Sequence, residues 1–174
     1  MPRISTQPVP RDTLLAQRML EGDYGDSFVA EVSGDVSLAA YIVAFYSSLA
    51  FRPERTLLGL IGRGASAADV KALAAGTAET FAAWSVEARA DDQILLRDFM
   101  GQTRSWLKVE PLPSSSKAVG RESSTRLLFG SGVGRSPGSG EASAIGRAIF
   151  TGLMPFHRFY ARQLLAGAVR ELGA

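Results

Sequence analysis

Residues 141–172 read EASAIGRAIFTGLMPFHRFYARQLLAGAVREL and predict one long α-helix. Apolar side chains recur at every third or fourth position, so they lie along one side of that helix. Pro155 removes a backbone donor inside the segment, and the helix is expected to bend or divide there. A long helix with one apolar side needs an equally long apolar surface to pack on. The expected stripe consists of Ile145, Ile149, Leu153, Phe156, Tyr160, Leu164 and Ala168.

A β-sheet can supply that surface, because five segments of the chain alternate between apolar and polar residues. Turn residues at 90–92 and 101–102 join three of these segments directly, which favours antiparallel pairing. The predicted strands are residues 27–32, 81–88, 94–100, 103–109 and 125–133.

Shorter helical patterns occupy the chain between the first two predicted strands. Residues 36–51 are apolar on most sides, which predicts a buried helix that begins after Asp35. Ser66 is well placed to cap a helix over residues 67–75. Residues 54–61 form a further short pattern.

These elements predict one α+β domain over residues 1–174. We expect an antiparallel β-sheet wrapped around the long C-terminal α-helix, with two or three short helices after the first strand. Residues 1–12 are expected to form an extended arm, and a short helix follows as far as Leu20. Residues 114–124 and 134–141 are rich in serine and glycine and are expected to be flexible loops.

The composition excludes several classes of site. The chain has no cysteine, which excludes disulfides, thiol catalysis and cysteine-ligated zinc, and its one histidine excludes multi-histidine metal sites. Its 19 basic and 17 acidic residues form no dense lysine and arginine run, so nucleic acid is not an expected partner. The longest apolar stretch, residues 38–49, is too short to span a bilayer, and a cytoplasmic location is expected. No nucleotide-binding or nucleophile-elbow motif occurs, and no cofactor is expected.

Two groups of charged residues have both a functional and a structural interpretation. Asp91, Asp92 and Asp98 could hold a hard cation, but paired aspartates are also typical of a hairpin turn, and we predict no metal site. Arg158 and Arg162 are four residues apart on the last helix. They form either a solvated helix face or a contact for an anionic headgroup.

Two segments resemble an uncharacterised bacterial family, the domain of unknown function numbered 2867. They are DYGDSF at residues 23–28 and LMPFHR at residues 153–158, and the similarity runs from about Leu14 to Leu172. The order of elements is also similar to the helix-grip group of START, polyketide-cyclase and plant-allergen proteins. That resemblance implies an apolar cavity between a curved sheet and the last helix, which would bind a lipid, steroid or polyketide. The group usually has seven strands, whereas five are predicted here, so a smaller or absent cavity is also an expectation.

The candidate site lies between the sheet and the last helix. Aromatic side chains would supply contact area for an apolar ligand, and a histidine would orient it. His157 and Tyr160 share a helix face, so they are also the candidate catalytic pair, with the histidine moving a proton and the tyrosine as donor. The structural alternative is a histidine that binds a carbonyl and holds the helix in place. The predicted ligand-binding residues are Trp84, Arg104, Phe129, Phe156, His157 and Tyr160.

A second candidate surface lies on the strand at residues 103–109. Arg104, Trp106 and Lys108 share the face opposite the predicted core, and cations can stack on an indole ring. Either this face binds a partner or a second copy of the chain, or the loop at residues 114–124 covers Trp106.

Three functions therefore compete. The first is a domain that binds an apolar or lipid-like small molecule, and this is the function that the sequence favours. The second is a small cyclase, hydratase or isomerase that uses His157, although no catalytic motif is recognisable. The third is an interaction module without a cavity that forms a homodimer through the Trp106 face.

Overall fold

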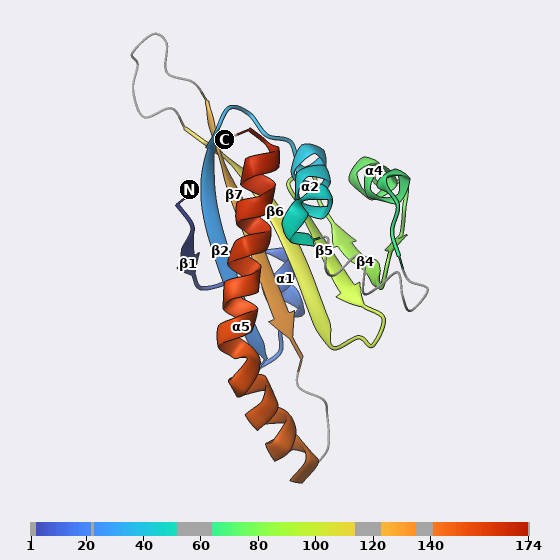
Figure 1. Cartoon of the computed structure of the whole chain (residues 1–174), viewed down its shortest axis with the longest axis vertical. Helices are drawn as coiled ribbons and strands as arrows, with labels where there is room; N and C mark the ends of the chain where they lie inside the picture. Colours follow the sequence, from blue (N-terminus) through green and yellow to red (C-terminus); the bar gives the residue numbers. More distant parts are fainter. Residues whose placement is uncertain (1–2, 22, 52–63, 114–122, 135–140, 174) are drawn as a thin grey trace.

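The computed structural model describes residues 3–21, 23–51, 64–113, 123–134 and 141–173, with the backbone alone over residues 141–155. It confirms the predicted α+β fold: a sheet of antiparallel strands packs against a long C-terminal helix in a helix-grip-like arrangement (Figure 1). The strand order is β1-β2-β7-β6-β5-β4-β3. The strands are β1 (Ser5–Gln7), β2 (Tyr24–Ser33), β3 (Thr80–Phe81), β4 (Trp84–Arg89), β5 (Gln93–Asp98), β6 (Thr103–Leu112) and β7 (Ser124–Val133). The helices are α1 (Leu14–Arg18), α2 (Leu38–Ser47), the 3-10 helix η1 (Leu49–Phe51), α4 (Ala67–Ala75) and α5 (Glu141–Glu171).

The sheet has seven strands among the described residues, two more than the sequence predicts. Strand β1 lies inside the expected N-terminal arm and pairs with β2, with Ser5 opposite Val29. Strand β3 separates from β4 at Ala82, whose φ of 53° breaks the extended backbone. These two strands are three and two residues long, which is too short for an alternating pattern to show.

A β-bulge changes which face the end of β4 presents. The predicted strand places Trp84, Val86 and Ala88 on one face, but the register with β5 shifts between Val86 and Ala88. Trp84 and Val86 pack against the main core, whereas Ala88 packs against the cluster on the other face. One extra residue in a strand reverses the alternation that follows it.

The helix ends depend on local caps. Ser66 caps α4 with a full capping box, in which its hydroxyl accepts from the Asp69 N–H at 3.2 Å, as predicted. Helix α2 begins after Ser37 rather than Asp35 and ends at Ser47, so Leu49 falls in η1 and is 63 % exposed. The helix predicted over residues 54–61 lies outside the described residues, as do the loops predicted at 114–124 and 134–141 apart from their ends.

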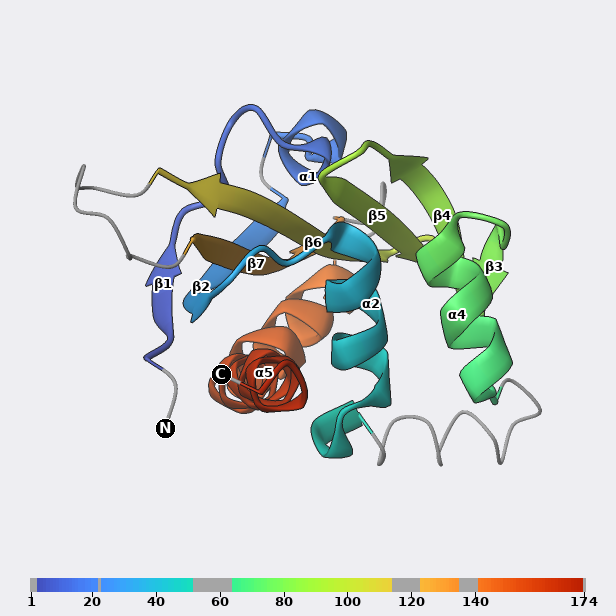
Figure 2. The ribbon, with the colours of Figure 1, turned by 90° about the horizontal axis from the view of Figure 1, so that it is seen from above.

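Helices cover both faces of the sheet. Figure 2 shows α2, α4 and α5 on one face and α1 on the other. The main core lies under α2 and α5, and alternate residues of the strands face it. Helix α5 adds Ala161, Leu164, Leu165, Ala168 and Val169, all buried.

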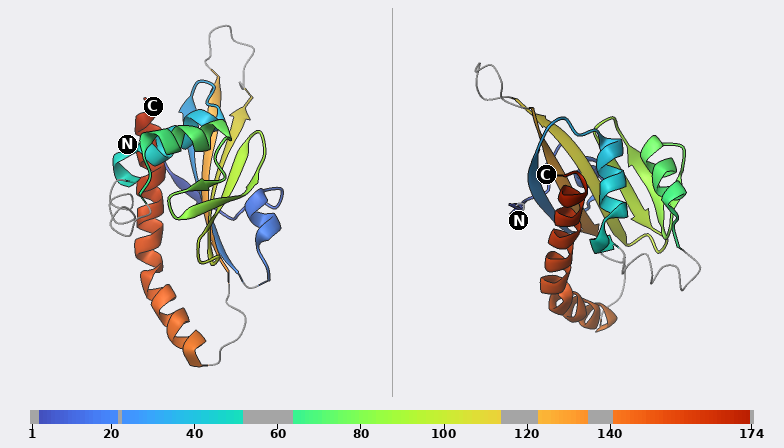
Figure 3. Two further views of the ribbon diagram at one scale, coloured as in Figure 1. Left: turned by 90° about the vertical axis from the view of Figure 1, so that its right-hand side faces the viewer. Right: turned by 45° about the horizontal axis from the view of Figure 1, so that its top comes forward.

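Helix α5 runs as one element through Pro155 and bends along its length (Figure 3). The predicted stripe is correct at Leu164 and Ala168 but wrong at Phe156, which is 67 % exposed. A four-residue step advances about 40° beyond a full turn, so Phe156 points about 120° away from Ala168. The other predicted members, at positions 145, 149 and 153, have no described side chains.

Trp106 is covered by α1, which corrects its interpretation as a partner surface, while the loop predicted to cover it lies almost wholly outside the described residues. Its ring is fully buried in a second cluster with Leu15 of α1 and with Leu95 and Leu128 of the sheet. The indole Nε1–H donates to Gln93 Oε1 at 3.0 Å, and the Leu14 N–H donates to the same oxygen at 2.9 Å. The indole is therefore part of the fold and is not exposed to a partner.

Gly130 on β7 leaves room for the Trp106 ring. A Cβ atom at Gly130 would lie 2.8 Å from Trp106 Cε3 and 2.8 Å from the Asp26 backbone oxygen. Gly130→Ala is expected to lower the free energy of unfolding by about 1–3 kcal/mol, because a tightly packed site cannot accept the extra group without shifting its neighbours. Urea denaturation followed by circular dichroism measures this change.

Gly134→Ala is the matched control, since its new Cβ would lie 3.7 Å from the Gln102 backbone oxygen, at ordinary contact distance. An equal loss in the two variants would show that the close approach of Trp106 to β7 does not limit stability.

Candidate functional site

Asp26 is the centre of a hydrogen-bonded cluster that joins β2, β7 and α5. Asp26 and Ser131 are register partners on adjacent strands, and the Ser131 hydroxyl donates to Asp26 Oδ1 at 2.6 Å. The Tyr24 hydroxyl donates to Asp26 Oδ2 at 2.9 Å. His157 of α5 completes the cluster, with its Nε2 at 2.8 Å from Ser131 Oγ and at 3.4 Å from Asp26 Oδ2.

The Asp26 carboxylate is buried, and hydrogen-bond donors surround it. Only 8 % of the residue is exposed. Burial raises the pKa of Asp26, but hydrogen bonds from His157, Ser131 and Tyr24 outweigh it, and the pKa lies below its usual value. Asp26 is therefore an ionised acceptor at neutral pH.

The donors around Asp26 determine the positions of the protons. The Ser131 hydroxyl uses its single proton to donate a hydrogen bond to Asp26, so its oxygen is left to accept one from His157. The nitrogen that donates is Nε2, because this atom contacts both Ser131 Oγ and Asp26 Oδ2. In the neutral ring the proton is then on Nε2 and the lone pair is on Nδ1.

This arrangement of serine, histidine and aspartate differs from a hydrolase triad. In a triad, the histidine uses one ring nitrogen for the serine and the other for the aspartate. Here Ser131 and Asp26 contact the same nitrogen, and the Ser131 proton points to the carboxylate. Ser131 is therefore not positioned as a nucleophile activated by His157.

A half-enclosed pocket of about 180 Å³ lies beside this cluster, between the sheet and α5. Its walls are mostly aromatic or aliphatic, and His157 and Ser131 form part of its polar side. The lining residues are Phe45, Tyr46, Phe51, Trp84, Thr103, Arg104, Ser105, Phe129, Ser131, His157, Tyr160, Ala161 and Leu164.

The structure brings five of the six predicted binding residues to this pocket. Trp84 lies at the start of β4, Phe129 is on β7, and His157 and Tyr160 are on α5. Arg104 also lines the pocket, but its guanidinium donates to both carboxylate oxygens of Glu87, at 2.7 and 3.1 Å. That hydrogen bond raises the pKa of Arg104, and its charge is already paired.

Phe156 is the predicted residue that the pocket does not include. It is mostly exposed, and its ring lies parallel to that of Tyr160 with centroids 6.3 Å apart. Tyr160 therefore has one aromatic neighbour outside the pocket, while its own side chain lines the pocket. His157 contacts Ser131 and Asp26, and it lines the same pocket as Tyr160.

Sequence reasoning missed Tyr24, Asp26 and Ser131 as site residues. Two of them lie in the DYGDSF segment, and His157 lies in the LMPFHR segment, so the fold joins the two quoted segments. Arg158 of the second segment also acts on Tyr24 of the first and lowers the pKa of its hydroxyl, although burial outweighs this and raises that pKa. Ser131 had no local signal, because a serine in a strand is compatible with any surface position.

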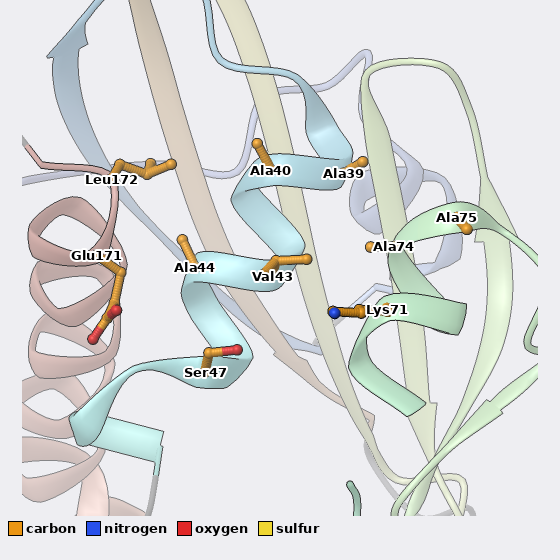
Figure 4. Close-up of a pocket in the computed structure, with 10 residues that line it drawn as sticks. All are labelled: Ala39, Ala40, Val43, Ala44, Ser47, Lys71, Ala74, Ala75, Glu171 and Leu172. Carbon is orange, nitrogen blue, oxygen red and sulfur yellow. The ribbon is translucent and has the colours of Figure 1, made fainter. Parts of the chain in front are cut away.

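A wider groove lies between α2, α4 and the end of α5 (Figure 4). Its volume is about 520 Å³, but it is open, and alanine and valine residues of α2 and α4 form most of its lining. Lys71 and Glu171 contribute its charges from two different helices. The groove lacks the convergent polar groups that surround Asp26.

Two of the three aspartates considered as cation ligands have other partners. Asp92 forms an ion pair with Lys108, and Asp98 Oδ1 accepts from the Gln102 and Thr103 N–H groups at 2.8 and 3.0 Å. Within the described parts of the chain, no group of three potential metal ligands occurs. Over the same parts, no helix has the length and apolar character needed to cross a membrane.

No family model matches the chain, no curated protein is similar to it at a significant level, and no solved structure matches it.

Proposed function

We propose that the chain binds a small apolar molecule in the pocket between the sheet and α5. The observation that supports this function is the pocket itself, whose aromatic lining meets a hydrogen-bonded polar cluster at His157. Such a combination is typical of small-molecule sites. The helix-grip-like arrangement adds support by analogy with the group that the sequence resembles.

The size of the pocket limits its occupant. Drug-sized ligands occupy pockets of about 300–1,000 Å³, whereas an engineered protein cavity of about 150 Å³ binds benzene. A volume of about 180 Å³ therefore suits a molecule with a single ring. This proposal is narrower than the lipid or steroid ligand that the family resemblance implies.

Toluene titration followed by NMR tests the proposal. The chain has two tryptophans, of which Trp84 lines the pocket and Trp106 is buried beneath α1. Toluene is expected to shift the indole N–H signal of Trp84 and to leave that of Trp106 unchanged. The Trp106 signal thus serves as an internal control in every spectrum, and a Trp84→Phe variant assigns the two signals.

Ser105→Phe is expected to block the pocket, since Ser105 is a small, partly exposed residue on its wall. Toluene affinity should fall at least about tenfold, which corresponds to about 55 Å² of lost apolar contact at about 25 cal/mol per Å². Ser85→Phe is the matched control, because Ser85 is exposed and is not part of the lining. Equal toluene affinity in the two variants, or a Trp84 signal that never moves, would contradict the proposal.

An enzyme is the second candidate, and the orientation of His157 favours it. A histidine with one nitrogen held by Ser131 and Asp26 can use the other nitrogen to move a proton. A cyclase, hydratase or isomerase of small apolar substrates would use that arrangement in the same pocket.

A further inference from the structure

In its neutral form, the ring of His157, a pocket residue, carries one unprotonated nitrogen beside the Asp26 cluster. Asp26 accepts hydrogen bonds from the Ser131 and Tyr24 hydroxyls, and the His157 Nε2–H group completes the cluster. The Nδ1 atom of the neutral ring then has a lone pair and no proton. Among the described residues, no hydrogen-bond or ion-pair partner contacts Nδ1, and 32 % of the side chain is exposed.

The charges near the pocket disfavour an anionic ligand. Asp26 carries a negative charge at 3.4 Å from the His157 ring. Arg104 lines the pocket, but its guanidinium is paired with Glu87, and Arg158 interacts with Tyr24 and is not part of the lining. A carboxylate or phosphate would lose its hydration shell without gaining an unpaired cation among the described lining residues.

A neutral hydrogen-bond donor fits these conditions. It needs no counter-charge, and the Nδ1 lone pair of the neutral His157 ring can accept its hydrogen bond. The remaining lining is mostly aromatic or aliphatic, and the volume of the pocket suits a single ring.

We infer that the ligand is a neutral single-ring molecule of the phenol class, whose O–H group donates to Nδ1 of His157 while its ring lies among the aromatic side chains. This inference rests on the proposed function and specifies its ligand. His157 acts here as a binding residue, with Asp26 and Ser131 as the positioning residues that hold its tautomer.

Three matched ligands test the inference on the intact chain: toluene, phenol and benzoate. Phenol is expected to bind about 3–10-fold more tightly than toluene, which is the gain of one neutral hydrogen bond. Benzoate is expected to bind more weakly than toluene. Equal affinities of phenol and toluene would overturn the inference and leave the proposed function intact, and tightest binding by benzoate would overturn it in favour of an anion site. Failure of all three ligands to bind would overturn both.

The tautomer gives a readout that does not depend on affinity. The chain has one histidine, so ¹⁵N-labelled histidine yields the ring nitrogens of His157 alone. We expect a protonated Nε2 and an unprotonated Nδ1, and phenol but not toluene should shift the Nδ1 resonance. A resting ring with its proton on Nδ1 would overturn the inference.

His157→Gln supplies the matched variant, because a glutamine amide can still donate toward Ser131 and Asp26 but lacks the ring Nδ1. The ratio of phenol affinity to toluene affinity should fall to about one, with the Trp106 indole signal reporting an intact fold. A retained preference in the folded variant would overturn the inference. If the variant does not fold, the tautomer measured in the unaltered chain decides the question.

Discussion

Replacing Trp106 with alanine is expected to lower the free energy of unfolding by about 3–5 kcal/mol, the usual range for a large aromatic side chain in a core. The ring is 0 % exposed and connects α1 to the sheet. Its removal leaves a cavity beneath Leu15 and deprives Gln93 of one of the two donors that meet at its oxygen. Urea denaturation at neutral pH measures the change.

Trp84→Ala is the control, because Trp84 is only partly buried and lines a pocket that already contains space. Its loss should be clearly smaller than that of Trp106→Ala. A double variant with Leu15→Ala should show less than the sum of the single losses, since the two side chains share one cluster. A loss below about 1 kcal/mol in Trp106→Ala would show that the packing of Trp106 between α1 and the sheet contributes little to stability.

Trp106 also shows what an alternating pattern of apolar and polar residues predicts and what it leaves open. The pattern correctly separates Leu107 and Val109 from Trp106 and Lys108, and the first pair faces the main core. It does not tell which of two faces meets solvent. Five-residue α1 has too few apolar positions to predict its packing partner, so the sequence leaves a binding partner and a covering loop as the two alternatives for the second face and does not indicate α1.

The same limit explains which parts of the candidate site were predicted. Trp84, Phe129 and Tyr160 were found because regular strands and a regular helix place alternate or fourth residues on a shared face. The same rule predicts Phe156 in the pocket, and that prediction is wrong. Positions repeated every four residues rotate gradually around the helix, so over several turns they leave the face that meets the core. Where the elements are irregular or long, the rule loses accuracy.

The polar half of the site depends on the pairing of two strands that are far apart in the sequence. Asp26 and Ser131 are 105 positions apart in the sequence and meet only because β2 and β7 are neighbours in the sheet. Sequence periodicity assigns residues to faces, but it does not determine which strands are adjacent or in what register. His157 was recognised as a candidate, yet the carboxylate that orients it required the fold.

Asp26→Asn is expected to lower the free energy of unfolding by about 1.5–3 kcal/mol at neutral pH, the usual contribution of a hydrogen bond to a charged group. The asparagine amide cannot accept from Tyr24, Ser131 and His157 at once, since one of its two terminal atoms is a donor. Glu31→Gln removes the same charge from an exposed ion pair with Arg126 and should cost less than about 1 kcal/mol.

The pH dependence distinguishes a charged cluster from simple packing. Because the folded-state pKa of Asp26 lies below its usual value, ionisation of Asp26 stabilises the fold at any pH above the unfolded value of about 3.9. That stabilisation is lost as the pH falls through the folded pKa, where Asp26 takes up a proton beside Tyr24, His157 and Arg158. The stability that Asp26 adds relative to Asp26→Asn should therefore be present above about pH 4 and should shrink below it. A difference that stays the same down to pH 2 would show that Asp26 acts through its shape, and the protonation scheme that places the lone pair on His157 Nδ1 would lose its basis.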